Sequence, residues 1–364
     1  MSKRITVVIG CVWVVAALAL QPLAAGDGVP GGQKQKGKPG TPPPFATFSV
    51  LPSLGANSVA YAVDEAGTVI VGQAFDRGGL LHAVKWTLQN GSWVMTELPW
   101  PADAVSASAR GVDNQGVAAG NDFTGSTSRP LLWPAGGGPT ILGCPSDLGR
   151  ADVHGISAAG EVVVGNMFGG GASVWRPGSC RENLPRLVEA GSAGAYAVNG
   201  DGTIIGGDAA LTVPDAPRVP VRWRNVGGQW SIEQLDSLSG SVRGANAAGD
   251  LAGSINVPCG SDNDCQRAVI WYALGSFLQL DTLGGDDSVA YDINASGEIV
   301  GMSTSPNVGL TAFFWSKSAG LVQLPFKGRA PLALALSNVR PDGTRLVVGH
   351  NSSAQAMVWT VRNP

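Results

Sequence analysis

A motif that recurs seven times between residues 45 and 364 constrains the fold of this chain more than any other feature. A typical copy contains Val or Ile, then Asp or Asn, a turn glycine, two or three aliphatic residues and a second glycine. A repeat of this period is typical of solenoids and propellers. The copies span residues 61–72, 110–120, 154–165, 196–206, 243–253, 291–301 and, more loosely, 334–349. Their turn glycines, 42 to 49 residues apart, are Gly67, Gly116, Gly160, Gly202, Gly249, Gly297 and Gly343.

Within a copy, β-branched residues stand on both sides of a short polar turn. Val63 precedes Asp64-Glu65-Ala66-Gly67, and Val69-Ile70-Val71 follows it. Two such runs predict a β-hairpin in which glycine supplies the positive φ and the Asp or Asn side chain caps the turn. A third and a fourth strand follow, as in residues 82–86 and 93–98. Each copy therefore predicts four antiparallel strands, which is the content of a propeller blade.

The third strand of every copy ends in a tryptophan. First strands are rich in Ala, Gly and Ser, as the crowded axis of a propeller requires, whereas the wider outer gaps need large rings to fill them. We therefore predict that the turn glycines and these tryptophans are structural residues. The tryptophans are Trp86, Trp133, Trp175, Trp223, Trp271, Trp315 and Trp359.

The number of fourth strands predicts how the ring closes. Six copies are followed by a fourth strand, but the seventh ends with its third strand at residues 359–361. The missing strand is residues 45–51, which we expect to pair with the last blade and so remove the exposed edges of an open array. The sequence predicts an all-β, seven-bladed β-propeller with four antiparallel strands per blade, formed by residues 45–364 as one domain.

The sixth copy resembles the HAF repeat of probable extracellular bacterial proteins. The resemblance rests on Leu283-Gly284-Gly285, residues 290–301 and Ala312-Phe313-Phe314-Trp315. His82-Ala83-Val84-Lys85-Trp86 is similar to the His-Ala-Phe core that names the repeat. The resemblance covers nearly all of residues 45–361, although the second, third and seventh copies are degenerate. It implies an extracellular, propeller-like protein and carries over no catalytic residues.

The N-terminus has the pattern of a secretory signal. Lys3 and Arg4 precede an uncharged apolar run at residues 5–20, and small residues follow at 24–26. This pattern predicts a signal peptide at residues 1–26, since the run is short for a membrane span of roughly 20 residues; a membrane anchor is the alternative. Residues 27–44, rich in Gly, Lys and Pro, are a predicted linker. We expect a secreted monomer, extracellular or periplasmic, with no membrane span after cleavage.

Secretion permits disulfides, and four cysteines lie beyond Cys11. Cys259 and Cys265 flank a five-residue, turn-rich segment, which favours their pairing. Pairing of Cys144 with Cys180 then follows only by parity, because four cysteines allow three arrangements. A zinc site is disfavoured, since the chain has no Cys-x-x-Cys and no histidine nearby.

No motif of a catalytic or cofactor site is present, and no cofactor or metal is expected. His82 and His154 occupy repeat positions and are interpreted as structural. The repeated acidic and amide residues lie at a constant place before the turn glycine, which favours turn capping over cation binding. A net charge of -3 without a basic cluster argues against nucleic acid. The repeated capping residues are Asp64, Asp113, Asn199, Asn246 and Asn294.

The loops between the second and third strands vary most between copies, and variable loops on rigid scaffolds often hold functional residues. We therefore take their charged residues as speculative binding candidates. We predict a non-catalytic binding or scaffold propeller for a protein, glycan or cell-envelope ligand. The alternative is a polysaccharide hydrolase or lyase with convergent carboxylates on the same face. The candidates are Asp76, Arg77, Asp122, Arg129, Asp215, Arg218, Asp262 and Asp264.

Overall fold

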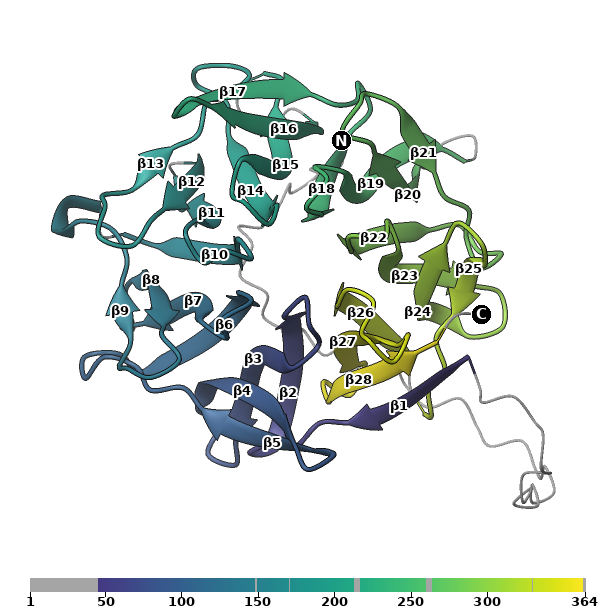
Figure 1. The fold of residues 1–364 in the computed structure, drawn as a ribbon. Coiled ribbons are helices and arrows are strands. Elements are labelled where there is room, and N and C mark those ends of the chain that lie inside the picture. Colours follow the sequence, from purple (N-terminus) through teal and green to yellow (C-terminus); the bar gives the residue numbers. More distant parts are fainter. Residues whose placement is uncertain are drawn as a thin grey trace, which may run out of the picture. The chain divides into compact units, whose positions relative to one another are not determined.

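The computed structural model describes residues 45–362 except 148, 170, 213–216, 260–263 and 329. The predicted signal peptide and linker, at residues 1–44, lie outside the described residues, as do Asp215 and Asp262. The described chain forms seven antiparallel sheets of four strands each. Figure 1 shows these sheets as blades arranged around one axis. The predicted seven-bladed propeller is therefore confirmed.

Six blades are built from consecutive strands. Blade 1 contains β2 (Gly55–Val63), β3 (Val69–Asp76), β4 (Leu81–Gln89) and β5 (Ser92–Glu97). Blade 2 contains β6 (Ser106–Val112), β7 (Ala118–Phe123), β8 (Ser128–Trp133) and β9 (Thr140–Ile141). Blade 3 contains β10 (Ala151–Ile156), β11 (Val163–Met167), β12 (Gly171–Trp175) and β13 (Glu182–Asn183). In each blade the first strand lies next to the axis and the fourth at the rim (Figure 1).

Blades 4 to 6 repeat this order. Blade 4 contains β14 (Ala193–Val198), β15 (Ile204–Ala210), β16 (Arg218–Val226) and β17 (Gln229–Gln234). Blade 5 contains β18 (Gly240–Ala245), β19 (Leu251–Pro258), β20 (Asp264–Trp271) and β21 (Phe277–Gln279). Blade 6 contains β22 (Ser288–Ile293), β23 (Ile299–Ser305), β24 (Gly309–Ser316) and β25 (Gly320–Gln323).

Blade 7 joins the two ends of the described chain. It contains β26 (Pro331–Leu336), β27 (Arg345–Asn351) and β28 (Ala356–Val361), and β1 (Ala46–Val50) is its fourth strand. β1 pairs antiparallel with β28, from Ala46 opposite Val361 to Val50 opposite Met357. Figure 1 shows the purple β1 lying alongside the yellow β28. The predicted closure of the ring by the N-terminal strand is therefore confirmed.

The strand–strand turns follow the predicted chemistry. All seven turn glycines have positive φ, for example 68° at Gly67. The second glycine of the repeat is needed for a different reason, a close approach to the first strand. A Cβ on Gly72 would lie 2.0 Å from the carbonyl oxygen of Val59. In the fourth copy Gly207 occupies this position, not Gly206 as the repeat boundary predicts, since its Cβ would lie 1.8 Å from the oxygen of Gly194.

The repeated tryptophans pack between blades, and four of them also tie neighbouring blades together. Trp86 donates from Nε1 to the carbonyl oxygen of Pro52 at 2.8 Å, and Trp359 donates to that of Pro325 at 2.7 Å. Trp133 and Trp223 make the same bond to Pro99 and Pro185. In each case the proline follows the last strand of the preceding blade. Six of the seven rings are buried and Trp315 is half-buried.

The only helical element in the described residues is a short 3-10 turn, η1 (Pro145–Asp147). No helix in this part of the chain has the length and apolar character needed to cross a membrane.

Candidate functional site

The predicted loop candidates lie mostly in strands, which corrects the loop boundaries drawn from the sequence. Asp122 and Arg129 are directly opposite residues of β7 and β8. Arg218 begins β16 and Asp264 begins β20, while Asp76 ends β3. The strands are longer at their loop ends than the sequence predicts. Polar residues such as Asp122 and Arg129 continue the β-ladder beyond the apolar middle of each strand.

Asp122 and Arg129 form a buried ion pair in blade 2. Arg129 donates from Nε to both carboxylate oxygens of Asp122 at 3.1 Å. Its Nη1 and Nη2 atoms donate to Asp103 at 2.7 and 2.8 Å. The two carboxylates raise the pKa of the guanidinium above its usual range. The Asp122 side chain has no exposed surface and is held by Arg129, so this carboxylate is closed to a ligand, whereas that of Asp103 is exposed at the rim of the cluster.

The other described loop candidates also serve their own blades. Asp76 accepts a hydrogen bond from the Leu80 amide at 2.8 Å and so closes the short loop after β3. The side chain of Arg77 lies over Gly55, where an added Cβ would meet its Cγ at 3.0 Å. Asp264 pairs with Pro258 at the end of the β19–β20 ladder. Asp76 and Arg77 belong to blade 1 and Asp264 to blade 5, so these residues are not brought together into one site.

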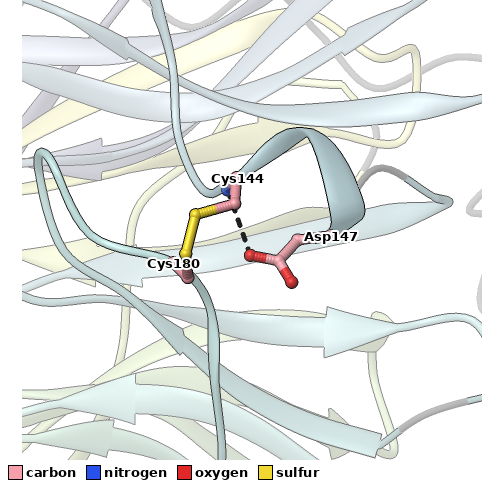
Figure 2. Close-up of side chains that lie close together, drawn as sticks. All are labelled: Cys144, Asp147 and Cys180. Carbon is pink, nitrogen blue, oxygen red and sulfur yellow. Dashed lines mark hydrogen bonds between the residues drawn. A yellow bond between two sulfur atoms is a disulfide. The ribbon is translucent and has the colours of Figure 1, made fainter.

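Both predicted disulfides are present: Cys259–Cys265 lies within blade 5, and Cys144–Cys180 joins the connection between blades 2 and 3 to the turn between β12 and β13 of blade 3. Figure 2 shows Asp147 beside the Cys144–Cys180 bond. Its Oδ2 atom accepts from the Cys144 amide at 3.0 Å and from the Arg181 amide at 2.8 Å. These amide bonds, the Arg181 amide first, lower the pKa of Asp147. The two sulfurs are bonded to each other and are therefore not available as thiolate metal ligands. The cluster is a disulfide whose two ends are also linked through Asp147.

The repeated acidic and amide residues cap their turns. Asp64 Oδ1 accepts from the amides of Thr68 and Val69 at 2.6 and 2.9 Å. Asn294 Oδ1 accepts from the amides of Ser296 and Glu298, both at 3.0 Å. Ser157 Oγ, at the same position in blade 3, accepts from the Val162 amide at 3.1 Å. The capping interpretation is therefore confirmed for these copies.

A ring of large side chains lines the central channel. Every axial strand carries a β-bulge at the same repeat position, where the register of the ladder skips one residue. An extra residue of this kind re-aims its side chain. The bulged residues all line one axial cavity of about 210 Å³. These seven residues, called here the channel ring, are Tyr61, Arg110, His154, Tyr196, Arg243, Tyr291 and Leu334.

The turns that follow the axial strands crowd around one end of this cavity. The Asn114 amide donates to the Ala158 carbonyl at 3.1 Å, and the Asn338 amide donates to the Glu65 carbonyl at 2.9 Å. Asn114 Nδ2 also donates to Glu65 Oε2 at 2.8 Å. A Cβ on Gly200 of blade 4 would lie 3.8 Å from Glu65 Oε1 of blade 1, so Glu65 reaches across the channel. The channel therefore narrows sharply at this end.

Two arginines of the channel ring lie on the faces of tyrosines. The Arg110 guanidinium carbon is 4.1 Å from the centroid of the Tyr61 ring, and that of Arg243 is 4.5 Å from the Tyr196 ring. Cation–π contacts of this length hold a planar guanidinium in place. Arg243 Nε also donates to Ser241 Oγ at 3.1 Å. Among the described residues, no carboxylate forms a hydrogen bond or ion pair with either arginine.

His154 stands between these arginines as a neutral side chain. Its pKa is lowered to about 4, mainly by removal from bulk water; Asp152 opposes this shift, and the charges of Arg110 and Arg243 add to it. Its Nε2 atom lies 3.0 Å from Asn166 Nδ2, and its ring meets Tyr196 edge-on with centroids 5.0 Å apart. His154, Arg110 and Arg243 line the same cavity, and the charges of both arginines act on the imidazole.

Asp292 is the unusual carboxyl group of the channel wall. Oδ1 accepts from the Ile293 amide at 2.8 Å and Oδ2 from the Leu336 amide at 2.9 Å, which links blade 6 to blade 7. The side chain is partly accessible from the cavity, but surrounding protein excludes bulk water, and this burial raises its pKa to about 7. With both oxygens held by amides, Asp292 serves as an interblade link.

Sequence reasoning missed the channel ring as a site, although each copy begins with one of its members. One pattern in the sequence does mark these positions, because a large polar or aromatic residue stands between small ones, as in Ala60-Tyr61-Ala62 and Ala195-Tyr196-Ala197. A position that should be small by alternation but is large marks a bulge or a ligand-facing residue.

The chain matches no protein-family model and no curated protein. Among solved structures it is similar to the β-propeller domain of the Trilobed protease from Pyrococcus furiosus, at 9% identity and TM-score 0.53, covering 83% of this chain and 93% of that one. It is similar to the Cps50 (Swd1) β-propeller domain of Myceliophteria thermophila, at 12% identity and TM-score 0.54, with 86% and 100% covered.

Virginiamycin B lyase from Staphylococcus aureus aligns at 8% identity and TM-score 0.52, covering 87% of this chain and 99% of the lyase. TolB from Acinetobacter baumannii aligns at 10% identity and TM-score 0.43, and the match covers 81% of this chain but only 64% of TolB. At identities of this size the comparisons show the propeller fold and nothing finer.

Proposed function

We propose that this protein is a secreted, non-catalytic binding propeller that holds its ligand at the channel ring. The supporting observation is the recurrence of one bulge in all seven axial strands, which lines the channel with three tyrosines, two arginines and a histidine. An axial strand needs only small side chains for packing. Large, half-exposed polar residues at this position therefore indicate a surface for a ligand.

The chemistry of the channel favours binding over catalysis. A glycoside hydrolase needs two carboxyl groups that act on the substrate from either side. Asp292 has both oxygens engaged by backbone amides, and the Asp122 carboxylate is held by Arg129. His154 is neutral and its Nε2 lies against an amide side chain. None of these groups is placed as an acid–base pair.

The proposal of secretion has two supports besides the N-terminal pattern. The fold contains two disulfides, which persist in oxidising compartments outside the cytosol. The copies also resemble the HAF repeat of probable extracellular proteins. We propose that the protein acts in the periplasm or outside the cell, on a glycan or another envelope component.

The test is capture of glycans or envelope fractions by the purified protein and by a variant with a filled channel. Leu334→Trp enlarges the ring member of blade 7, and we expect it to abolish capture. Leu274→Trp is the matched control, because Leu274 is 99% exposed, on the turn between β20 and β21. Circular dichroism confirms that both variants fold. Equal capture by the wild type and both variants would place the ligand elsewhere and contradict the proposal.

A further inference from the structure

We propose that the channel ring recognises a compact sugar acid, with Arg110 and Arg243 binding its carboxylate and the tyrosines packing against its ring. This inference rests on the proposed function, because it assigns a ligand class to the same channel.

The two positive charges of the channel ring lie on its wall in fixed positions. Both arginines occupy bulge positions of axial strands, β6 and β18, and both line the axial cavity. Stacking on Tyr61 and Tyr196 orders each guanidinium before a ligand arrives. A pre-ordered guanidinium loses less side-chain entropy on binding, and its planar fork matches a carboxylate.

The two arginines of the channel ring are not matched by carboxylates in direct contact with them. The carboxylates nearest the channel are already engaged: Asp208 by Arg218, Glu65 by Asn114, and Asp292 by two amides. The Oδ2 atom of Asp152 lies 3.6 Å from Nε2 of His154. Arg110 and Arg243 are thus two half-buried cations that make no hydrogen bond or ion pair with a carboxylate of the described residues, although the charge of Arg243 acts on Asp208, which Arg218 already holds. An anion that enters the channel would provide the missing counter-charge.

The size and lining of the cavity favour a small ligand with an apolar ring face. A cavity of about 210 Å³ admits a compact group and not a folded partner. Its wall combines tyrosine rings with a small number of polar groups, which is the composition of small-molecule sites. Tyrosine rings pack well against the apolar face of a sugar ring while their hydroxyls remain polar. Aromatic faces beside two cations therefore suit a sugar acid better than a bare anion.

The experiment is calorimetric titration of the full chain with sodium glucuronate, with glucose and inorganic phosphate as comparisons. We expect glucuronate to bind and its affinity to fall with added NaCl, because the contact is between charges. The variant Arg110→Gln with Arg243→Gln should weaken binding by about tenfold or more, since hydrogen bonds to charged groups are stronger than neutral ones. Arg176→Gln, an ion-paired arginine after β12 in the outer part of blade 3, is the matched control and should bind as the wild type does.

The outcomes separate the two proposals. If glucose binds as tightly as glucuronate, or if the double arginine variant retains full affinity, the sugar-acid inference is wrong while channel binding stands. Tighter binding of phosphate than of glucuronate also overturns it. If Leu334→Trp does not reduce glucuronate binding, the channel is not the site, and both proposals fail together.

Discussion

At the scale of single residues, one bulged position in each axial strand determines which side chains line the channel. In blade 1 the ladder pairs Ala60 with Gly72 and Ala62 with Val71, so Tyr61 between them has no partner. Its small neighbours stay packed, and only the bulged side chain is large. Polar side chains therefore enter the channel without disturbing the blade-to-blade contacts on either side.

Asp292 gives a prediction at this scale. Its pKa of about 7 in the folded protein lies above the ordinary value of 3.8, so the folded protein binds this proton more tightly than the unfolded chain does. The resulting stability is complete below about pH 4 and is lost as the pH rises through 7. We expect the melting temperature of the wild type to fall over this range relative to that of Asp292→Asn, whose side chain does not titrate.

The comparison needs a control for the substitution itself, since asparagine cannot accept both amide bonds. Asp281→Asn changes an exposed carboxyl outside the channel and should leave the pH profile unchanged. Melting temperatures are measured at several pH values for all three proteins. Parallel profiles for the wild type and Asp292→Asn would show that this carboxyl does not titrate with a raised pKa.

At the scale of strands, neighbouring blades are joined by tryptophans that donate to prolines. The bond needs a proline directly after the preceding blade, as at Pro52, Pro99, Pro185 and Pro325. Blade 5 departs from this pattern, because Leu235 is followed by Asp236. There the Nε1 atom of Trp271 is buried with no hydrogen-bond partner among the described residues.

This difference predicts unequal effects of one substitution. Trp223→Phe removes the bond to Pro185 and leaves a half-buried carbonyl without its donor, whereas Trp271→Phe removes an N–H group that has no partner among the described residues. We expect Trp223→Phe to lower the free energy of unfolding by about 1 kcal/mol more than Trp271→Phe does. Alanine at either site should cost about 3–5 kcal/mol, because each ring fills space between blades. Denaturant unfolding measures all four variants; equal losses for the two phenylalanine variants would contradict a role for the bond.

At the scale of the whole molecule, the ring is held closed by a strand from the opposite end of the described chain. β1 covers the edge of β28 and satisfies its backbone groups. Phe45 adds an edge-on contact with Phe314 of blade 6, at 5.9 Å between centroids. The last blade therefore depends on residues far away in sequence, unlike the six blades built from consecutive strands.

Deleting residues 45–51 tests this closure. The deletion exposes the edge of β28 and opens the apolar contacts under β1, so we expect a lower melting temperature and aggregation through the free edge. A chain that lacks only residues 27–44 is the control. Differential scanning calorimetry and light scattering follow both chains, and equal behaviour would mean that β1 is dispensable for the ring.

Much of the fold can be predicted from the sequence because the information is local and repeated. Each turn glycine lies next to the strands that it joins, and seven copies reinforce one another. The missing fourth strand of the last blade follows from counting. The Cys259–Cys265 pairing is also local, since six positions separate the two residues. These features depend on the backbone geometry of short stretches, and that geometry can be predicted from the residue types within each stretch.

The site could not be predicted in the same way, because it depends on contacts between residues distant in sequence. Asp122 and Arg129 are variable charged residues near a loop, and only the ladder shows that they neutralise each other. Arg110 and Arg243 are 133 positions apart in the chain and line one cavity with His154 only when the ring has closed. The repeat determines the blades, whereas closure of the ring decides which side chains share the channel, since that is set by the packing of every blade against its neighbours.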